Sequence, residues 1–528
     1  MAYNFLPYDE EQLYLLPASI VEWVKDDSLA RFVGETVDLL DRRGELKGFY
    51  EGYRRDGWGH PAYHPRMLVK VLVYGYSVGV TSSRKLAAAC ENDVALRYLT
   101  ANQQPDFRTI SAFRKEHLSA LNELFEQVLG LCEEAGLVKL GRVALDGRKV
   151  AGNASLDQNR DEAWFREKAR KLVAEAERVD AEEDERYGKE RRGDELPNGL
   201  RRREERGKRL EAALDRIEEK KRQAAMKQER KIEKRRTEEE KTGRKARGRK
   251  PKDPETAALE AAKKTKANVT DPESRIMKTR RGWVQGFNGQ AAAECDNQVI
   301  VAQDVTQEEN DVRQLGPMLK RCEEQAGGRP SEVLADAGYW SEENAKLESA
   351  ETELFIATKK GWKERQAMQE APPPRGRIPN GLSARERMER KLLTKRGREA
   401  YKQRGSTIEA VFGQMVMRGL VRFKLRGLKK VRAEWSLWCT THNLLKLWRK
   451  GWSNDNSVSH TDIQQHEEGV WIGPQARDNL VHHTTIQNNI SPGTGVEVEE
   501  AQGNVLYCNQ IVDNGSHGVE NMDGAALD

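Results

Sequence analysis

The sequence lacks the long apolar segments of a membrane protein. A transmembrane helix needs roughly 18–20 apolar residues in succession, and no run among the 528 residues reaches that length. The first twenty residues also lack the basic region and apolar core of a secretory signal. Charged residues make up 33% of the chain, and the mean hydropathy is −0.83. We therefore expect a cytoplasmic protein.

The chain also has little that would bind zinc or form disulfides. Its six cysteines are scattered, without a CxxC pair, and its nine histidines include no HExxH pattern. The sequence therefore predicts neither a zinc site nor a disulfide framework.

Charge is unevenly distributed along the chain. Residues 453–528 contain twelve acids, no lysine and a single base, Arg477. Residues 1–452 therefore carry 89 bases against 73 acids, within a total net charge of +5. A basic body indicates a polyanionic partner such as nucleic acid, although a highly charged solvated surface has the same composition.

Three carboxylates mark the chemistry that this chain could perform. Asp146 ends the apolar run 143–145, and Asp336 ends the run 333–335, two patterns typical of buried strands. Glu409 lies in a helical pattern. Acids placed in this way can meet at one point and bind hard divalent cations. Two such ions are a common device for phosphodiester cleavage and strand transfer.

Periodicity predicts a helical N-terminal region over residues 1–135. The apolar run 67–76, a cap at Ser82 and a further cap at Thr109 indicate short helices with tight breaks. Such helices suit a helix-turn-helix DNA-binding module, although any small helical bundle has the same pattern. The candidate DNA contacts in this region are Arg108, Arg114 and Lys115.

After a strand-like segment within 136–155, residues 156–274 are dominated by Glu, Lys, Arg and Ala. Alternating charge blocks predict solvated helices with disordered parts, and the absence of sustained a/d positions argues against a long coiled coil. The segment 247–251 resembles the core of an AT-hook, a basic arm for the minor groove, with Arg247 and Arg249 as candidate contacts. A basic turn in a low-complexity segment is the alternative.

Residues 275–452 return to an ordered α/β pattern. Strands are predicted at 283–288, 298–302, 333–336 and 354–358, with helices at 311–324, after Ser341 and over 399–450. The basic, Pro-rich stretch 360–398 predicts a loop or linker. Trp435, Trp438 and Trp448 follow helical spacing, which favours packing of the last helix on the sheet over base stacking. One α/β domain with an insertion after its first strand accounts for this order.

The last region, 453–528, is rich in Asn, Gly, Val and Ile. Asn488 and Asn509, like Ile490 and Ile511, lie 21 positions apart, a period that resembles two turns of a parallel β-helix. At least three turns are usually needed to bury a core. We therefore interpret this short β-rich tail as a fragment, derived from fusion or read-through. A capping role for the tail is the alternative.

Several short motifs, in this order, resemble those of the DDE transposases of bacterial insertion sequences, in the broad IS-four/IS-five superfamily. The resemblance covers roughly residues 1–452. It rests on residues 105–111 (PDFRTIS), 145–147 (LDG), 286–288 (GFN), 334–339 (LADAGY), 408–413 (IEAVFG), 426–427 (RG) and 442–444 (HNL).

The resemblance implies a ribonuclease-H-like catalytic domain. Asp146, Asp336 and Glu409 are the implied catalytic residues, and they would bind two Mg²⁺ ions, for which Mn²⁺ can substitute. The implied partners are double-stranded DNA at the terminal inverted repeats of the element, the target DNA and a second copy of the chain in a homodimer. The location is then the nucleoid.

Around Glu409 the family places a tyrosine and an arginine upstream and a lysine downstream. Tyr401 and Arg404 fit, with Arg404 one residue further from the acid than that pattern has it. Val416 stands near the lysine position, and Arg418 is the nearest base. Tyr401, Arg404 and Arg418 are candidate DNA contacts, and surface charge is the alternative for both arginines.

Two further functions are compatible with the sequence. A DNA-binding regulator derived from a transposase would keep the basic and helical parts without turnover, because of the tail or the Val416 departure. A metal-dependent nuclease would cleave without strand transfer. The complete set of three acids favours an active transposase.

Overall fold

The structure is a computed structural model. It describes residues 19–53, 61–171, 198–245, 248–279, 282–359 and 381–451, nine short strands between 457 and 522, and a few isolated positions. The chain divides into two compact units, one formed by Leu40–Leu444 and the other by Met1–Leu39 with Leu445–Asp528. No helix in the described part of the chain is both long and apolar enough to cross a membrane.

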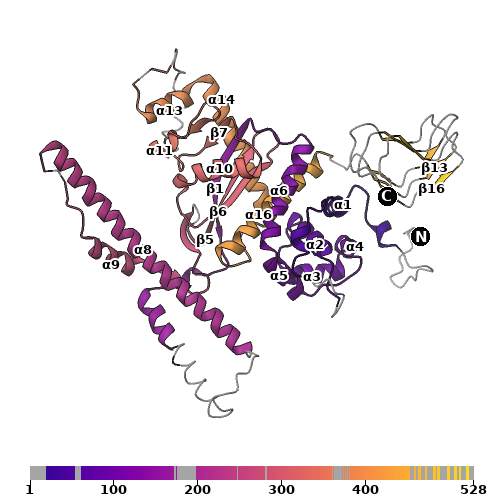
Figure 1. Cartoon of the computed structure of the whole chain (residues 1–528), viewed down its shortest axis with the longest axis horizontal. Helices are drawn as coiled ribbons and strands as arrows, with labels where there is room; N and C mark the ends of the chain where they lie inside the picture. The colour runs from indigo at the N-terminus through magenta and orange to yellow at the C-terminus, as the bar shows by residue number, and fades with distance from the viewer. Residues whose placement is uncertain are drawn as a thin grey trace, which may run out of the picture. The chain divides into compact units, whose positions relative to one another are not determined.

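The larger unit is built on one mixed, six-stranded sheet (Figure 1). Its strands are β1 (Arg142–Ala151), β4 (Arg275–Thr279), β5 (Gly282–Glu294), β6 (Ile300–Thr306), β7 (Glu332–Ala335) and β8 (Glu353–Ile356). The order is β6–β5–β1–β7–β8, with β4 beside the first part of β5. β1, β7 and β8 are parallel, and β5 pairs antiparallel to its neighbours. This mixed sheet is consistent with a ribonuclease-H-like core.

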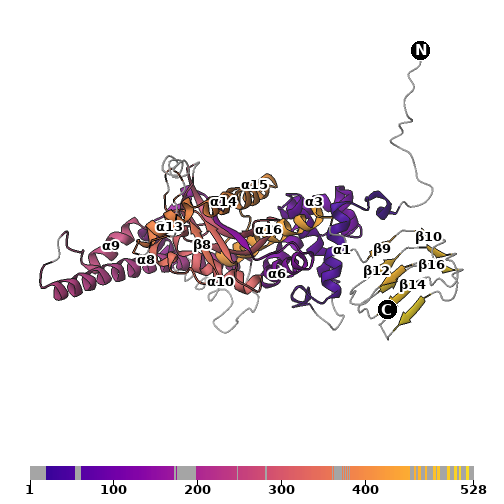
Figure 2. The same cartoon turned by 90° about the horizontal axis from the view of Figure 1, so that it is seen from above.

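Helices cover both faces of this sheet, and in Figure 2 the sheet lies between α10 (Leu315–Gln325) and α14 (Lys395–Arg404). The predicted strand pair at 283–288 and 298–302 is confirmed as β5 and β6. Part of the predicted linker at 360–398 is instead helical, because Ser383 and Glu386 form a capping box that starts α13 (Ala384–Leu393). Thr394 then caps α14 by accepting from Gly397 N.

The N-terminal helices of this unit are α2 (Pro65–Ser77), α3 (Ser83–Asn92), α4 (Val94–Leu99), α5 (Phe107–Glu116) and α6 (Leu118–Glu134). The predicted run 67–76 is confirmed within α2. The predicted cap at Thr109 is wrong, because Asp106 caps α5 by accepting from Arg108 N at 2.7 Å. Ser82 precedes α3 as expected, although its side chain makes no capping bond.

These helices pack on the long final helix, α16 (Leu428–Arg449). Ser436 Oγ donates to Leu121 O in α6 at 3.1 Å. Trp435 and Trp438 are buried, and Trp435 Nε1 donates to Gln290 O in β5 at 3.1 Å. Packing of these tryptophans on the sheet and its neighbours is therefore confirmed, and neither ring is available for base stacking.

The inserted region contains more ordered structure than its composition predicts. α8 (Asn198–Thr242) and α9 (Pro254–Lys264) pack side by side (Figures 1 and 2). Beneath them, a short ladder joins β2 (Asn159–Arg160) to β3 (Ala267–Asn268). A small apolar cluster lies at the base, formed by Phe165, Leu210, Ala213, Ile217, Ala262 and Ala267. The insertion thus has its own core at the end nearest the ladder, whereas the distal part of α8 is a solvated, charged helix.

The strands of the C-terminal segment stack in parallel. They form three sheets. The first contains β9 (Ser457–Ser459), β12 (Leu480–His482) and β15 (Val505–Tyr507). The second contains β10 (Asp462–Gln464), β13 (Thr485–Gln487) and β16 (Gln510–Val512), and the third contains β11 (Val470–Ile472), β14 (Val496–Glu499) and β17 (Val519–Met522). Ile486 pairs with Ile511, so the paired strands are 25 residues apart there and the 21-residue spacing is not the pairing register. Each sheet has three strands rather than the two turns visible in the sequence. Asn488, Ile490 and Asn509 lie outside the described residues.

Candidate active site

Asp146 and Asp336 lie side by side on the sheet. The parallel pairing of β1 with β7 ends at Leu145 opposite Ala335, so both aspartates come directly after the last paired residues. The prediction that Asp146 ends its strand is wrong, because β1 continues to Ala151 through its antiparallel pairing with β5. Asp146 therefore has a more rigid backbone than a residue at a strand end.

Glu409 reaches this place through an unusual helical turn. Gly405–Glu409 forms a π-helical turn between α14 and α15 (Ala410–Met417). A π turn closes one residue later than an α turn, and such turns are frequent at functional sites. The turn therefore absorbs the extra residue between Arg404 and Glu409, and the two side chains still face each other, with Arg404 Nη1 3.4 Å from Glu409 Oε1.

Arg404 is the cation around which the acids gather. It is 7% exposed, and its Nη2 donates to Asp146 Oδ2 at 2.5 Å. The charges of Asp336 and Glu409 also act on it and raise the pKa of its guanidinium against the opposing effect of burial. The structure thus places all three predicted acids within electrostatic reach of one arginine. Glu409 is the most open of them, with 65% of its side chain exposed.

Burial is the main cause of an altered acidity at Asp146. It raises the pKa of this carboxyl from 3.8 to about 7; Arg404 opposes the rise, and the negative charge of Asp336 adds to it. Asp146 Oδ1 accepts from Gly147 N at 2.8 Å, which stabilises the ionised form. Mutual repulsion among the acids therefore contributes, but it is secondary to desolvation.

A fourth carboxylate, Asp311, belongs to the same cluster and was not found in the sequence. It lies at the turn between β6 and α10, and its Oδ1 accepts from Asn288 Nδ2 and Gln290 Nε2, each at 2.7 Å. Burial and the charge of Asp336 raise its pKa. No recognisable pattern surrounds Asp311 in the sequence. The signal that could have located it was Asn288, which lies in the GFN motif.

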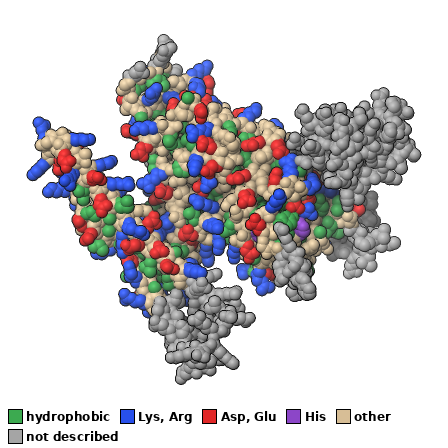
Figure 3. All heavy atoms as spheres, viewed as in Figure 1, with side chains coloured by type: hydrophobic (Ala, Val, Ile, Leu, Met, Phe, Trp, Pro, Cys, Tyr) green, Lys and Arg blue, Asp and Glu red, His purple; other side chains and the backbone are tan. Residues whose placement is uncertain are grey.

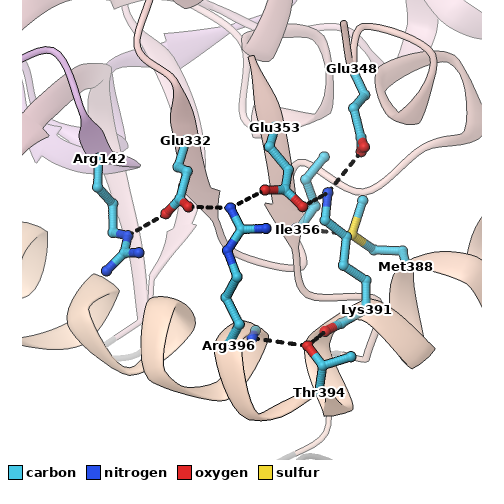
Figure 4. Close-up of polar contacts among 10 residues, drawn as sticks. Arg142, Glu332, Glu348, Glu353, Ile356, Met388, Lys391, Thr394 and Arg396 are labelled. Carbon is cyan, nitrogen blue, oxygen red and sulfur yellow. Dashed lines mark hydrogen bonds and ion pairs between the residues drawn. The ribbon is translucent and has the colours of Figure 1, made fainter. Parts of the chain in front are cut away.

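The α13–α14 segment is fastened to the edge of the sheet by a chain of ion pairs (Figure 4). Glu332 on β7 bonds both Arg142 Nε and Arg396 Nη2 at 2.5 Å. Arg396 also pairs with Glu353 on β8, and Lys391 Nζ lies 3.1 Å from the same carboxylate. These contacts fix the helix that carries Arg404 against the strands that carry the two aspartates.

The donor set fits a hard divalent cation. All candidate ligands are carboxylate oxygens, which Mg²⁺ and Mn²⁺ prefer. Asp146, Asp336 and Glu409 act on the buried guanidinium of Arg404, and Lys149 acts on Asp311, so four carboxyls face two cations. Among the described residues, however, no three such side chains are already arranged to hold an ion. Arg404 Nη2 donates to Asp146 Oδ2, so one oxygen of this carboxyl is already bonded.

Some candidate DNA contacts are open and others are not. Arg114 is wrong as a DNA contact: it is 4% exposed and donates to Tyr76, Thr81 O and Ser83. Arg418 is half-buried and lies over the Trp438 ring. The remaining candidates differ: Arg108, Lys115 and Arg249 are exposed, Tyr401 is half-buried, and Arg247 lies outside the described residues.

A basic cleft of about 580 Å³ lies between the insertion, α5 and the start of α16. The bases that line it are Lys115, Lys208, Arg209, Lys424, Arg426 and Lys430. A second hollow, of about 550 Å³, shares Asn153 and Arg426 with it and contains Trp283, which is 56% exposed. On the face shown in Figure 3, basic and acidic side chains are mixed. The cleft is therefore a local concentration of positive charge, of the kind that binds phosphates.

Comparison with known families identifies both ends of the larger unit. Residues 18–116 match the family model described as transposase domain (DUF772), and residues 377–448 match the one described as transposase DDE domain. The second match contains Arg404, Glu409 and the π turn. No curated protein and no solved structure matches the chain. Two separate segments of the chain are therefore similar to transposase domains, and the strands next to the two aspartates lie between these segments in the sequence.

Proposed function

We propose that this protein is a DDE-type transposase, which cleaves DNA at the ends of an insertion sequence and joins the freed 3′-hydroxyl to target DNA. The observation that carries the proposal is the meeting of Asp146, Asp336 and Glu409 around Arg404, in a chain with a transposase DDE domain. We propose these three acids as the catalytic residues.

In this proposal Asp146 and Asp336 hold divalent cations and Glu409 completes their ligands. When bound, the two ions activate the attacking oxygen and neutralise charge on the leaving oxygen. Water attacks the phosphorus in the first step and the DNA 3′-oxygen leaves. In the second step the freed 3′-hydroxyl attacks a target phosphate, from which the target 3′-oxygen departs.

The chain's own residues would position the DNA and the acids. The basic cleft is lined by six basic side chains and by Asp271 and Glu273, so it carries a net positive charge toward a phosphate backbone, and it adjoins a hollow lined by Ala151 at the end of β1. Five residues of strand separate Ala151 from Asp146, which is roughly 17 Å. Duplex DNA that follows the cleft could thus reach the acids within about half a helical turn. We further propose a homodimer that pairs the two inverted repeats.

The test is a strand-transfer assay with Mg²⁺ on a plasmid that carries the terminal inverted repeats of the element. We expect joined products with the natural protein and none with Asp146→Ala, Asp336→Ala or Glu409→Ala. Glu399→Ala is the matched control, because this acid is exposed on α14. Undiminished activity in any of the three variants removes that acid from the site. Cleavage without joining favours a nuclease, and binding without either reaction favours a regulator.

A further inference from the structure

Asp311 is held in a way that its structural role alone does not require. Asn288 and Gln290 come from neighbouring positions on one face of β5, and both donate to the same oxygen, Oδ1. In the described part of the chain, no donor reaches Oδ2. Two amides therefore fix the carboxylate and leave its second oxygen open, which is how outer partners orient a metal ligand.

The chain of contacts continues into the motif that follows Asp336. Tyr339 is buried, and its hydroxyl donates to Gln290 Oε1, which fixes the amide so that its nitrogen points at Asp311. Asn344 holds the Tyr339 backbone by donating to its carbonyl at 2.6 Å. Motif residues with no evident catalytic chemistry thus converge on this one carboxylate.

The space beside Asp311 is kept open by two glycines. A Cβ on Gly147 would lie 2.3 Å from Asp311 Oδ1, and one on Gly338 would lie 3.5 Å from Asp311 Oδ2 and 2.8 Å from Asp336 Oδ1. The open oxygen of Asp311 and the carboxylate of Asp336 therefore border the same small space.

A second, independent observation points to a ligand at this place. Asn288 is fully buried, yet no donor among the described residues reaches its side-chain oxygen. That oxygen lies 2.9 Å from the position of a Gly147 Cβ, on the same side as Asp311 Oδ1. A buried acceptor without a donor is costly, and a metal-bound water is a donor that would satisfy it.

We propose that Asp311 is a fourth acidic residue of the centre, and that its Oδ2 shares a divalent cation with Asp336. This inference rests on the proposed function. The amides of Asn288 and Gln290, with the Tyr339 hydroxyl behind them, set the position of the ligand. Asp311 thus enters the centre from the turn before α10, whereas Glu409 enters it from the π turn after α14.

The test is a Mn²⁺ titration of the full chain, followed by calorimetry and by electron paramagnetic resonance of the free ion. In Asp311→Asn, which keeps an oxygen for the two amides, we expect one site to weaken by at least tenfold with the thermal unfolding temperature unchanged or higher. Asp304→Asn is the matched control, since this acid lies on β6 and pairs with Arg432. It should bind as the natural protein does.

A second variant separates ligation from positioning. Tyr339→Phe removes only the hydroxyl that orients Gln290, so we expect a smaller loss of Mn²⁺ affinity, of about threefold. Unaltered Mn²⁺ binding by a folded Asp311→Asn protein overturns the inference and leaves the proposed transposase intact. If the natural protein itself binds no Mn²⁺ and cleaves no DNA, the proposed function falls, and the role of Asp311 with it.

Discussion

Two buried arginines lie in the larger unit, and their surroundings differ in one respect. Arg114 donates a hydrogen bond to the hydroxyl of Tyr76. That hydroxyl in turn donates to Glu434 Oε1 at 3.3 Å. The carboxylate of Glu434 also accepts hydrogen bonds from the backbone amides of Lys424 and Leu425 at 2.8–2.9 Å. One buried cation thus faces one buried anion, and nearly every polar atom has a partner inside the protein.

Around Arg404 the charges do not balance. Asp146, Asp336 and Glu409 act on it directly, and Asp311 adds a fourth carboxylate, on which Lys149 is the one further cation that acts among the described residues. A closed network stabilises a fold, whereas a surplus of carboxylates destabilises it until a cation arrives. The two sites therefore differ in net charge and in the number of carboxylate oxygens without a hydrogen-bond donor. The balanced site is structural, and the site with surplus charge is the one that we propose to be functional.

The largest expected effect comes from breaking the closed network. Arg114→Met leaves Glu434 buried without its cation, so we expect the free energy of unfolding to fall by about 3–5 kcal/mol. Denaturant unfolding measures the loss, and Mg²⁺ should not change it. Adding Glu434→Leu should restore part of the stability, because the unpaired charge is then gone. A double variant as unstable as the sum of the two single variants would contradict this account.

The open network should respond differently to the same substitution. Arg404→Met removes the partner of Asp146, and we expect a smaller loss of about 1–3 kcal/mol, because that carboxyl can hold a proton. The cation that Arg404 displaces can then bind. Mn²⁺ at a hundred times its Kd adds about 2.7 kcal/mol to stability. We expect a larger Mn²⁺-dependent rise in unfolding temperature than in the natural protein; an equal rise would show that Arg404 does not compete with the metal.

The pH dependence of metal binding tests the same centre. Because the pKa of Asp146 is raised to about 7, the folded, metal-free protein keeps a proton that the unfolded chain loses near pH 4. The contribution of Asp146 to the free energy of unfolding therefore falls as pH rises from about 4 to about 7, and it does not change further above pH 7. Mn²⁺ must displace the proton, so its apparent affinity should rise about tenfold per pH unit up to about 7 and then level off.

Titrations between pH 5 and 8.5 measure this dependence. The rise from pH 5 to 7 should be about fiftyfold, or roughly 2.3 kcal/mol, because the carboxyl is still half protonated at pH 7. Asp146→Asn should bind more weakly and lose most of the dependence, whereas Glu399→Asn, on the exposed face of α14, should keep it. Equal affinity at pH 5 and pH 8 would show that Asp146 is not a ligand.

The sequence predicted the three acids and most of the strands because each depends on a local pattern. Asp146 and Asp336 follow apolar runs, and Glu409 lies in a recognisable motif. The role of Arg404 could not be predicted, because an α-helix would have turned it away from Glu409, and only the π turn brings them together. The place of Asp311 in the centre could not be predicted, because its hydrogen-bond partners on β5 are 21 and 23 residues away in the chain.

Other errors have a similar origin. The prediction of Arg114 as a DNA contact rested on its place as a polar residue between the apolar positions of its helix, and its buried partner Glu434 is more than 300 residues away in the chain. In the described part of the insertion, the few apolar residues gather at one end, where Phe165 and Ile217 meet, and the composition does not predict this cluster. Contacts between residues far apart in the chain cannot be predicted from short local sequence patterns.

The smallest effect concerns the space between the acids. Gly147→Ala places a methyl group 2.3 Å from Asp311 Oδ1, where the neighbouring atoms are fixed by hydrogen bonds. We expect a loss of about 1–2 kcal/mol in unfolding free energy, together with weaker Mn²⁺ binding, because overpacking displaces the carboxylate. Gly130→Ala is the matched control: this glycine lies in α6 with nothing within 4 Å of a Cβ, so alanine should stabilise the helix by up to about 1 kcal/mol. If Gly147→Ala matches Gly130→Ala in both unfolding free energy and Mn²⁺ binding, Asp311 is not held against β1. The centre would then contain one carboxylate fewer than we propose.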